Sequence, residues 1–404
     1  MTIDEQIAIL RRGTTDIYGE DDLRSKLASG KKLRVKLGVD PTAAHVTLGW
    51  GVVLRKLRDF QKLGHTACLI IGDFTAMIGD PSGKSKTRKQ LTREEVQANV
   101  DAVSSQIYKI LDPELTEIYY NKDWLGKMSF EDVIRLCSRY TVARIMERDD
   151  FTKRWEAHQP ISMHEILYPL CQGMDSVELK ADVELGGNDQ MFNNLVGRTL
   201  MEQYGLDPQV VILSPLLVGT DGKEKMSQSL GNYVSVVDTP NDMFGKTMSI
   251  PDELILNWFE LCTDVPMDEA RAMVEPGKNP RDAKVRLAKE IVALYHSVED
   301  ADAAEQFFVE TFSQKKQVTD APEFVIDREA FSGGGFGGGL PVAYLVTLVG
   351  GADSRGSAKK LIQAGAVSLD GERVADLAAS FGAAELDGKI LRVGKKLFVK
   401  LVVK

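Results

Sequence analysis

One lysine lies among hydroxyl-bearing residues in the run Lys225-Met-Ser-Gln-Ser229, shortly after Gly222. On a glycine-containing loop, such a lysine can close over a triphosphate and stabilise the negative charge that moves toward pyrophosphate during reaction. A lysine-serine loop is also typical of solvated surface. We therefore interpret the run as part of a nucleotide-binding site only because polar groups elsewhere in the chain support that interpretation.

A second set of polar residues is spaced for one face of a helix. Tyr168, Gln172 and Asp175 stand at positions i, i+4 and i+7. Leu170 and Met174 lie among them, so the polar groups are expected to be partly buried and to need partners. Asp175 can accept a hydrogen bond from a phenol, while Gln172 and Tyr168 can hold the amino group of a small amino acid. The alternative is an internal hydrogen-bond network without a ligand.

A glycine pair occurs in the run Gly186-Gly-Asn-Asp-Gln190. Paired glycines permit a close approach of the backbone to a ligand, and Asp189 suits a ribose hydroxyl. A glycine turn with an N-capping Asn or Asp is the alternative interpretation.

The elements around these residues indicate a parallel sheet. Residues 33–39 and 65–74 are predicted strands, and residues 47–63 form a predicted helix between them. A strand, helix and strand in succession build a doubly wound sheet, which binds ligands beyond the carboxyl ends of its strands. Asp40 and the turn at residues 75–80 follow the two strands, so both are expected at that edge.

Composition changes along the chain predict four parts. A Rossmann-like catalytic domain with inserted helices is expected over residues 1–230 and a helical domain over residues 231–325. A glycine-rich flexible linker is expected over residues 326–339. Six of the nine residues 331–339 are glycine, and the other three are two phenylalanines and one serine. Residues 340–404 then form a small basic α+β module with ten Lys and Arg against six Asp and Glu.

Bulk properties narrow the class of protein. The 404 residues exceed one ordinary domain, and no apolar run is long enough to span a bilayer. Cys68, Cys137, Cys171 and Cys262 are too far apart in sequence for a metal cluster or a disulfide framework. The net charge of -9 argues against a protein that coats DNA. We predict a cytoplasmic protein with reduced thiols and no membrane or DNA partner.

The motifs occur in an order that is similar to a known family. The chain resembles tyrosyl-tRNA synthetase, a class I aminoacyl-tRNA synthetase, of the bacterial type with a C-terminal S4-like RNA-binding domain. The resemblance covers nearly the whole chain. It is carried by Gly38-Val39-Asp40-Pro41-Thr42, Gly79-Asp80-Pro81-Ser82-Gly83-Lys84, Tyr168 with Gln172 and Asp175, Gly186-Gly187-Asn188-Asp189-Gln190, and Lys225-Met226-Ser227.

The resemblance implies a role for each matching residue. Tyrosine would be bound by Asp80, Asn121, Tyr168, Gln172, Asp175 and Gln190. ATP would be bound by Asp40, Gly49, Gly187, Asp189, Lys225 and Ser227. Catalytic work on the phosphates would fall to Thr42, Thr47, Lys84, Arg88 and Lys225. RNA phosphates would meet Arg355, Lys359 and Lys360, whose alternative is an ordinary solvated helix.

The implied reaction joins a tyrosine carboxylate to the α-phosphate of ATP, supplied as its Mg²⁺ complex, and then transfers tyrosine to the 3′ end of tRNA(Tyr). No tightly held protein metal is implied, and a homodimer is expected. No editing domain is needed, because a buried acceptor at Asp175 would be left unpaired by phenylalanine; tyrosyl-tRNA synthetase is itself the standard example of this discrimination.

Four positions depart from the family pattern. Its two signature histidines at the helix start are missing from Thr47-Leu-Gly-Trp50, although Thr47 can still bind an anion at a helix N-terminus. We expect Trp50 to pack, with stacking on adenine as the alternative. Gln228 replaces a usual lysine, and Lys36 stands where some relatives carry a tyrosine hydroxyl near the substrate phenol.

Two other functions fit parts of the pattern. A paralogue that has lost aminoacylation could act as an RNA-binding or regulatory protein through its helical and basic parts. An enzyme with the same chemistry could activate another aromatic amino acid. Pyrophosphate exchange that depends on tyrosine distinguishes both from the main prediction.

Overall fold

The computed structural model describes residues 1–40, 45–82, 92–313, 322–332, 339–394 and 397–404. The chain forms two compact units, Met1–Ala304 and Glu305–Lys404. Each unit has its own sheet and its own apolar core, so each is described by itself.

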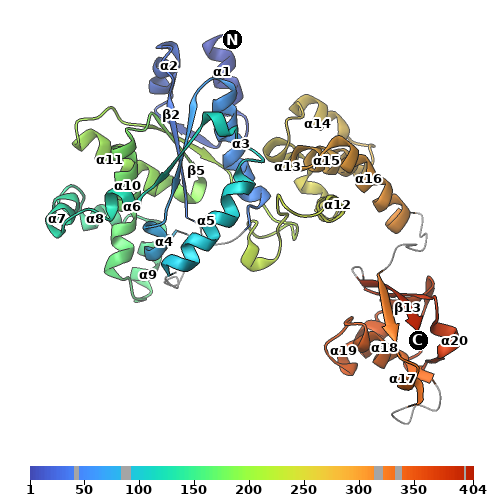
Figure 1. Cartoon of the computed structure of the whole chain (residues 1–404). Helices are drawn as coiled ribbons and strands as arrows, with labels where there is room; N and C mark the ends of the chain where they lie inside the picture. Colours follow the sequence, from blue (N-terminus) through green and yellow to red (C-terminus); the bar gives the residue numbers. More distant parts are fainter. Residues whose placement is uncertain (41–44, 83–91, 314–321, 333–338, 395–396) are drawn as a thin grey trace. The chain divides into compact units, whose positions relative to one another are not determined.

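The first unit is built on a six-stranded sheet with the strand order β1-β6-β5-β2-β3-β4 (Figure 1). Its strands are β1 (Asp16–Tyr18), β2 (Arg34–Val39), β3 (Thr66–Ile71), β4 (Thr116–Tyr120), β5 (Val183–Gly187) and β6 (Val210–Ser214). β1 is antiparallel to β6, and the other pairs are parallel. From β2, the sheet is extended by β3 and β4 on one side and by β5 and β6 on the other. The order therefore reverses between β2 and β5, which is where such sheets bind ligands.

Helices cover both faces of this sheet. Cys68 and Ile70 of β3 pack with Leu179 on one face, while Ile71 packs with Val100 on the other. All six residues of β3 are buried, which explains its continuous apolar sequence. The helices up to the last strand are α1 (Ile3–Arg11), α2 (Glu20–Ala28), α3 (Leu48–Lys62), α4 (Thr75–Ile78), α5 (Arg93–Ile107), α6 (Lys122–Leu125), α7 (Phe130–Cys137), α8 (Val142–Ile145), α9 (Asp149–Glu156), α10 (Met163–Leu179) and α11 (Met191–Gln203).

The predicted strand, helix and strand are confirmed as β2, α3 and β3. The helical spacing of Tyr168, Gln172 and Asp175 is confirmed as well, because all three lie on α10. This helix begins with a capping box between Ser162 and Glu165 and packs along α11 (Figure 1).

The remainder of the first unit is helical, as the sequence predicted for the region after residue 231. It contains α12 (Pro240–Met248), α13 (Ile255–Cys262), α14 (Met267–Met273), α15 (Pro280–Tyr295) and α16 (Val298–Phe308), of which α16 continues into the second unit as the π-helix η5 (Val309–Ser313). Because Met1–Ala304 forms one compact unit, a boundary at residue 230 stays a prediction.

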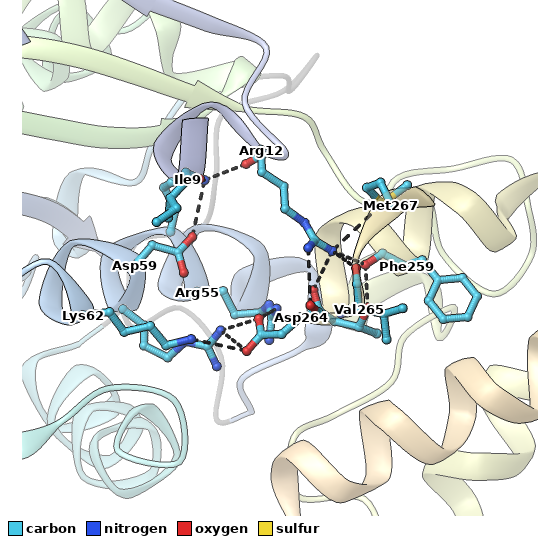
Figure 2. Close-up of polar contacts among 12 residues, drawn as sticks. Ile9, Arg12, Arg55, Asp59, Lys62, Phe259, Asp264, Val265 and Met267 are labelled. Atoms are coloured by element: carbon cyan, nitrogen blue, oxygen red, sulfur yellow. Dashed lines mark hydrogen bonds and ion pairs between the residues drawn. The ribbon is translucent and has the colours of Figure 1, made fainter. Parts of the chain in front are cut away.

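Two contacts fix the helical region to the rest of the first unit. Arg12 donates from one guanidinium nitrogen to the carbonyl oxygens of Thr263 (3.0 Å) and Val265 (2.8 Å), which follow α13 (Figure 2). In the same view, Asp264 forms ion pairs with Arg55 and Lys62 of α3, and its Oδ2 lies 3.3 Å from the Nζ of Lys62. The helix α3 is thus held near its C-terminal end by the loop after α13.

The second unit contains a five-stranded sheet, β10-β9-β12-β13-β7, and a two-stranded sheet, β11-β8. Its strands are β7 (Glu323–Ile326), β8 (Gly339–Pro341), β9 (Val367–Leu369), β10 (Glu372–Arg373), β11 (Ser380–Gly382), β12 (Ile390–Val393) and β13 (Leu397–Val403). Its helices are α17 (Glu329–Ser332), α18 (Val342–Leu348), α19 (Arg355–Gln363) and α20 (Ala383–Leu386). The predicted α+β character of the C-terminal module is confirmed.

The N-terminal limit of this unit differs from the prediction that residues 326–339 form a linker. β7 pairs in parallel with β13, and Ile326 and Phe331 are buried in the same core as Leu401. The unit therefore starts before the glycine-rich run, of which residues 333–338 lie outside the described residues. Local composition did not show this, because β7 is a strand only through its distant partner β13.

In the parts of the chain that the structure describes, no helix is long and apolar enough to cross a membrane. Cys68, Cys171 and Cys262 are buried free thiols, and Cys137 is half-buried. No group of acidic, histidine or cysteine side chains in the described ranges is arranged to hold a metal ion.

Candidate active site

The centre of the site is a chain of hydrogen bonds at the carboxyl ends of β2, β3 and β4. Asp40 follows β2, and its two carboxylate oxygens accept from the hydroxyls of Thr75 and Tyr168, both at 2.8 Å. Asn121 follows β4 and donates to Thr75 (3.0 Å) and to Asp175 (3.3 Å). Residues from three strand ends and from α10 are thereby joined into one polar cluster.

This cluster depends on a glycine at the end of β3. A Cβ atom at Gly72 would lie 1.9 Å from Asp40 Oδ1 and 2.4 Å from Thr75 Oγ1. No side chain fits there unless the aspartate moves. The close approach of Asp40 to Thr75 therefore requires glycine.

Asp175 is the most deeply buried carboxylate of the cluster. It accepts from the indole nitrogen of Trp124 at 2.8 Å and from Asn121. Burial raises the pKa of Asp175 to about 7, although the ammonium of Lys36 and the two hydrogen bonds oppose that rise. An acceptor with this environment can bind a phenol hydroxyl that reaches the same place.

Tyr168 lies among three carboxylates. Burial raises the pKa of its phenol well above the ordinary value, and the negative charges of Asp40, Asp80 and Asp175 raise it further. The hydroxyl stays protonated and donates to Asp40. All three carboxylates thus disfavour ionisation of the same phenol.

Asp80 is fixed by the chain around it. Its oxygens accept from the backbone N–H of Ser82 (2.8 Å) and from the side-chain amide of Gln190 (2.9 Å). Arg148, which is buried, donates to the hydroxyl of Ser82 at 3.2 Å. Asn193 donates to Gln190 at 3.1 Å. The sequence therefore placed Asp80 and Gln190 together correctly, but not the buried arginine behind them.

Gln172 points toward the sheet. Its side-chain amide donates to Asn194 (2.8 Å) and Glu184 (3.2 Å). Both partners are buried. The internal network that the sequence left open as an alternative is thus present at Gln172, and a ligand would have to reach an amide that already has two acceptors.

Several residues predicted to bind the nucleotide meet beside the end of β5. Asp189 lies in the 3-10 turn η2 (Asn188–Gln190) directly after Gly187, where a Cβ atom would approach Asp189 Oδ1 to 2.8 Å. The ammonium of Lys225 lies 3.1 Å from Asp189 Oδ2. The lysine loop and the glycine pair, far apart in sequence, are side by side.

The start of α3 packs on the same loop. Thr47 caps the helix and its hydroxyl accepts from the N–H of Trp50 at 3.4 Å. Gly49 is in van der Waals range of Met226, since a Cβ there would lie 3.5 Å from Met226 Cβ. Gln228 donates to the carbonyl of His45. The N-terminus of α3 and the residues around Lys225 therefore form one surface on which positive helix-end charge and a lysine coincide.

Ser227 takes part in this loop through its backbone and side chain. Its N–H donates to Asn232 Oδ1 at 2.8 Å, and its hydroxyl lies 2.8 Å from that of Ser229. The serine shapes the loop that carries Lys225.

The predicted RNA-binding residues lie together in the second unit. Arg355, Lys359 and Lys360 are exposed on α19, which begins at the capping residue Ser354. The guanidinium of Arg355 stacks over the ring of Tyr344 at 5.0 Å. The helix presents its cations to solvent.

Two groups of residues differ from the predicted site. Thr42, Lys84 and Arg88 were predicted to act on the phosphates, and they lie outside the described residues. Trp124 and Thr75 were missed by sequence reasoning. Trp124 lies on the short helix α6 and reaches Asp175 on α10, a contact distant in sequence that no local pattern indicated.

The fold and the site define a class of protein. The family model for class I tRNA synthetases (W and Y) matches residues 28–313, and the chain belongs to this family. Its relatives narrow the group further. Tyrosine–tRNA ligase of Chlorobium chlorochromatii is 52% identical over 99% of this chain and 98% of its own length. That of Moorella thermoacetica is 50% identical over 98% of this chain and 95% of its own length. The predicted resemblance to tyrosyl-tRNA synthetase is confirmed.

Solved structures agree with the fold. A C-terminally truncated mitochondrial tyrosyl-tRNA synthetase of Aspergillus nidulans aligns with a TM-score of 0.63 at 22% identity and covers 77% of this chain and 94% of that chain. Tyrosyl-tRNA synthetase from Archaeoglobus fulgidus, complexed with L-tyrosine, aligns with a TM-score of 0.61 at 23% identity over 75% of this chain and 100% of that chain. These likenesses confirm the predicted doubly wound α/β architecture.

Proposed function

We propose that this protein is a tyrosine–tRNA ligase that activates tyrosine with ATP and transfers it to tRNA(Tyr). One observation carries the proposal. The buried acceptor Asp175, with donors from Trp124 and Asn121, is joined through Thr75 to Asp40 at the strand ends where the nucleotide residues also gather. A phenol at Asp175 and a carboxylate near Asp40 are the two ends of one tyrosine molecule.

The chemistry of the first step fits these residues. A carboxylate attacks the α-phosphate of ATP, and this needs no strong protein base. The rate comes from holding two anions together and from cations and dipoles that stabilise the transition state. Lys225 and the N-terminus of α3 supply positive charge, and Asp189 suits the ribose hydroxyls. Thr42, Lys84 and Arg88 are proposed as further phosphate contacts.

Recognition of tyrosine follows from the polar cluster. Asp175 accepts the phenol hydroxyl, while Asp80 and Gln190 meet the amino group beside Tyr168. Gln172 assists through its position on the same helix face. Phenylalanine would leave Asp175 without its hydrogen bond in a buried site, which is costly.

ATP enters as its Mg²⁺ complex, so the metal is part of the substrate. The cation shields the β- and γ-phosphates and shares the work of Lys225. We place the reaction in the cytoplasm, where tRNA is charged.

A homodimer is also proposed, because part of the first unit exposes large apolar side chains. Phe130 and Ile134 of α7, Val142 of α8, Trp155 of α9 and Met163 at the start of α10 are all more than half exposed. Exposed apolar side chains in such number are typical of an interface between copies. Phe130→Asp with Ile134→Asp should yield monomers in sedimentation equilibrium; an unchanged mass would contradict this placement of the interface.

Transfer to tRNA requires contact with RNA, which we assign to the second unit and the helical region. The exposed cations of α19 support this role, because phosphate contacts dominate the affinity of proteins for nucleic acids. Binding of tRNA(Tyr) should fall with rising salt, and triple replacement of Arg355, Lys359 and Lys360 by alanine should reduce the slope of that dependence.

Tyrosine-dependent exchange of labelled pyrophosphate into ATP tests the catalytic proposal. We expect exchange with tyrosine and little with phenylalanine or tryptophan. The alternative of a degenerate RNA-binding paralogue predicts tRNA binding without exchange with any amino acid. Exchange that depends on tryptophan instead would move the specificity to another aromatic substrate.

A further inference from the structure

Behind the amino-acid site lies an ion pair that is wholly buried. Lys36 of β2 and Glu184 of β5 are paired across the two central parallel strands, with Nζ 2.8 Å from Oε1. Their side chains are 0% and 1% exposed. Removing two charges from water is expensive, so a pair in this position needs further hydrogen bonds to persist.

Four of those hydrogen bonds lead to one turn of α10, and a fifth comes from Gln209. Lys36 donates to the carbonyl oxygen of Gln172 at 3.0 Å and to the hydroxyl of Ser176 at 2.7 Å. Glu184 accepts from the side chains of Gln172 at 3.2 Å and of Ser176 at 3.3 Å, and from Gln209. The pair therefore fixes the turn from which Gln172 and, one residue before Ser176, Asp175 project.

The pair also acts on Asp175 through its charges. Among the charged groups that face Asp175, the ammonium of Lys36 on β2 lowers its pKa and the carboxylate of Glu184 on β5 raises it, the effect of Lys36 being the larger. From α10 itself, Tyr168 and Cys171 face the same carboxyl. Burial raises the pKa of both, so both stay neutral.

We propose that Lys36 and Glu184 form one positioning unit for the substrate side chain. Lys36 favours the anionic form of Asp175, which accepts the phenol hydroxyl, and Glu184 partly offsets that charge while it holds Gln172 in place. Neither residue of the pair touches the substrate. The inference rests on the proposed function, because it takes Asp175 as the phenol acceptor.

The structure gives this unit a measurable consequence. The pKa of Asp175 is raised to about 7, so its anionic form increases through neutral pH. For tyrosine, kcat/KM should rise with pH around that midpoint, since this parameter reports ionisations of the free enzyme. Changing the charges of the pair should move the midpoint in a direction fixed by the charge removed.

Two variants of the full chain test the direction. Glu184→Gln removes the anion and keeps the shape, so the midpoint of kcat/KM for tyrosine in pyrophosphate exchange should move down. Lys36→Met with Glu184→Gln removes both charges without leaving one unpaired. Since Lys36 has the larger effect, the midpoint should then move up by about 0.5 to 1 pH unit.

A matched control is available in the same unit. Arg154 and Glu165 form another buried ion pair, with nitrogen and oxygen 2.6 Å apart. Arg154→Met with Glu165→Gln removes the same kinds of charge elsewhere. It should lower thermal stability without moving the midpoint, which separates loss of a buried pair in general from the proposed action on Asp175.

The outcomes are distinct. Opposite shifts in the two Lys36–Glu184 variants, with no shift in the control, support the inference. An unchanged midpoint in either variant overturns it, and the double variant, which leaves no charge unpaired, suffices if Glu184→Gln does not fold. Absence of tyrosine-dependent exchange in the unmodified protein would instead refute the proposed function.

Discussion

The ammonium of Lys225 lies 3.1 Å from a carboxylate oxygen of Asp189. Both residues are assigned to ATP, the lysine to phosphates and the aspartate to the ribose. Without nucleotide they neutralise each other across the site. In the proposed complex with ATP, this pair would separate and each residue would gain a new partner.

Lys225→Ala should lower kcat for tyrosine activation with little change in KM for tyrosine. The lost contact is a charge-assisted hydrogen bond of about 1.5–3 kcal/mol, which corresponds to about 10- to 100-fold in rate. Single-turnover formation of tyrosyl-adenylate measures the effect. Lys223→Ala, which changes an exposed lysine on the same loop, serves as the control. An equal loss in both variants would remove the specific role of Lys225.

Asp175→Ala should impair tyrosine far more than ATP. The phenol loses its acceptor, and Trp124 and Asn121 lose a shared partner. We expect kcat/KM for tyrosine to fall by at least about 10- to 100-fold, while KM for ATP stays near its original value. Steady-state exchange with each substrate varied in turn measures both. Unchanged tyrosine kinetics would refute the assignment of Asp175.

Gly72→Ala should disturb the polar cluster from a position outside the substrate contacts. Its Cβ would displace Asp40, which would lose its hydrogen bonds to Thr75 and Tyr168. Activation should slow by about 10-fold or more, as expected for lost hydrogen bonds to a charged group. Gly245→Ala on α12 is the control, because a Cβ at Gly245 also meets no atom within 4 Å. Similar activity in the two variants would contradict the close-approach argument.

Asp264 should contribute stability that disappears in acid. The cations of Arg55, Arg58 and Lys62 hold its pKa well below its ordinary value. A carboxylate with a lowered pKa in the folded state stabilises the fold above its unfolded pKa of about 4, and that stability is lost as pH falls below this value.

Asp264→Asn should therefore lower Tm at pH 7, by the equivalent of about 1–2 kcal/mol because the half-exposed carboxylate is screened by water. The difference in Tm between the two proteins should shrink as pH falls below about 4. Thermal unfolding followed by circular dichroism measures it. Asp268→Asn, an exposed carboxylate of α14, should have little effect.

The effect of removing the second unit on solubility and activity should depend on the residue at which the chain is cut. A protein ending at residue 313 loses the whole β7–β13 pairing, whereas one ending at residue 339 keeps β7 and uncovers Ile326 and Phe331. The first should remain monodisperse, catalyse exchange and charge tRNA less well, with a deficit that shrinks at high salt. The second should aggregate in light scattering. Equal charging by the first truncated protein and the intact protein would contradict a role of this unit in RNA binding.

The sequence predicted those parts of the fold that have local signals. The apolar run of β3 and the helical spacing on α10 were sufficient to predict both elements. Asp40 and Asp80 were correctly brought to one edge, because parallel strands end on the same side. By contrast, β7 and the contact of Trp124 with Asp175 depend on partners distant in sequence, which no local pattern reveals.

Lys36 shows the same limit at the level of a single side chain. The resemblance implied a position near the substrate phenol, but the charge of Lys36 could not be interpreted without Glu184. These two residues are neighbours only because β2 and β5 lie beside each other in the sheet.

The burial of Lys36 with Glu184 constrains how this enzyme can change over evolutionary time. Replacing either residue alone by an uncharged one strands the other charge in the interior, at a cost of about 3–5 kcal/mol. Such an intermediate would be close to unfolding, given the small net stability of most proteins. The two codons are therefore expected to covary among relatives, and lineages with a different side chain at one position should carry a compensating substitution at the other.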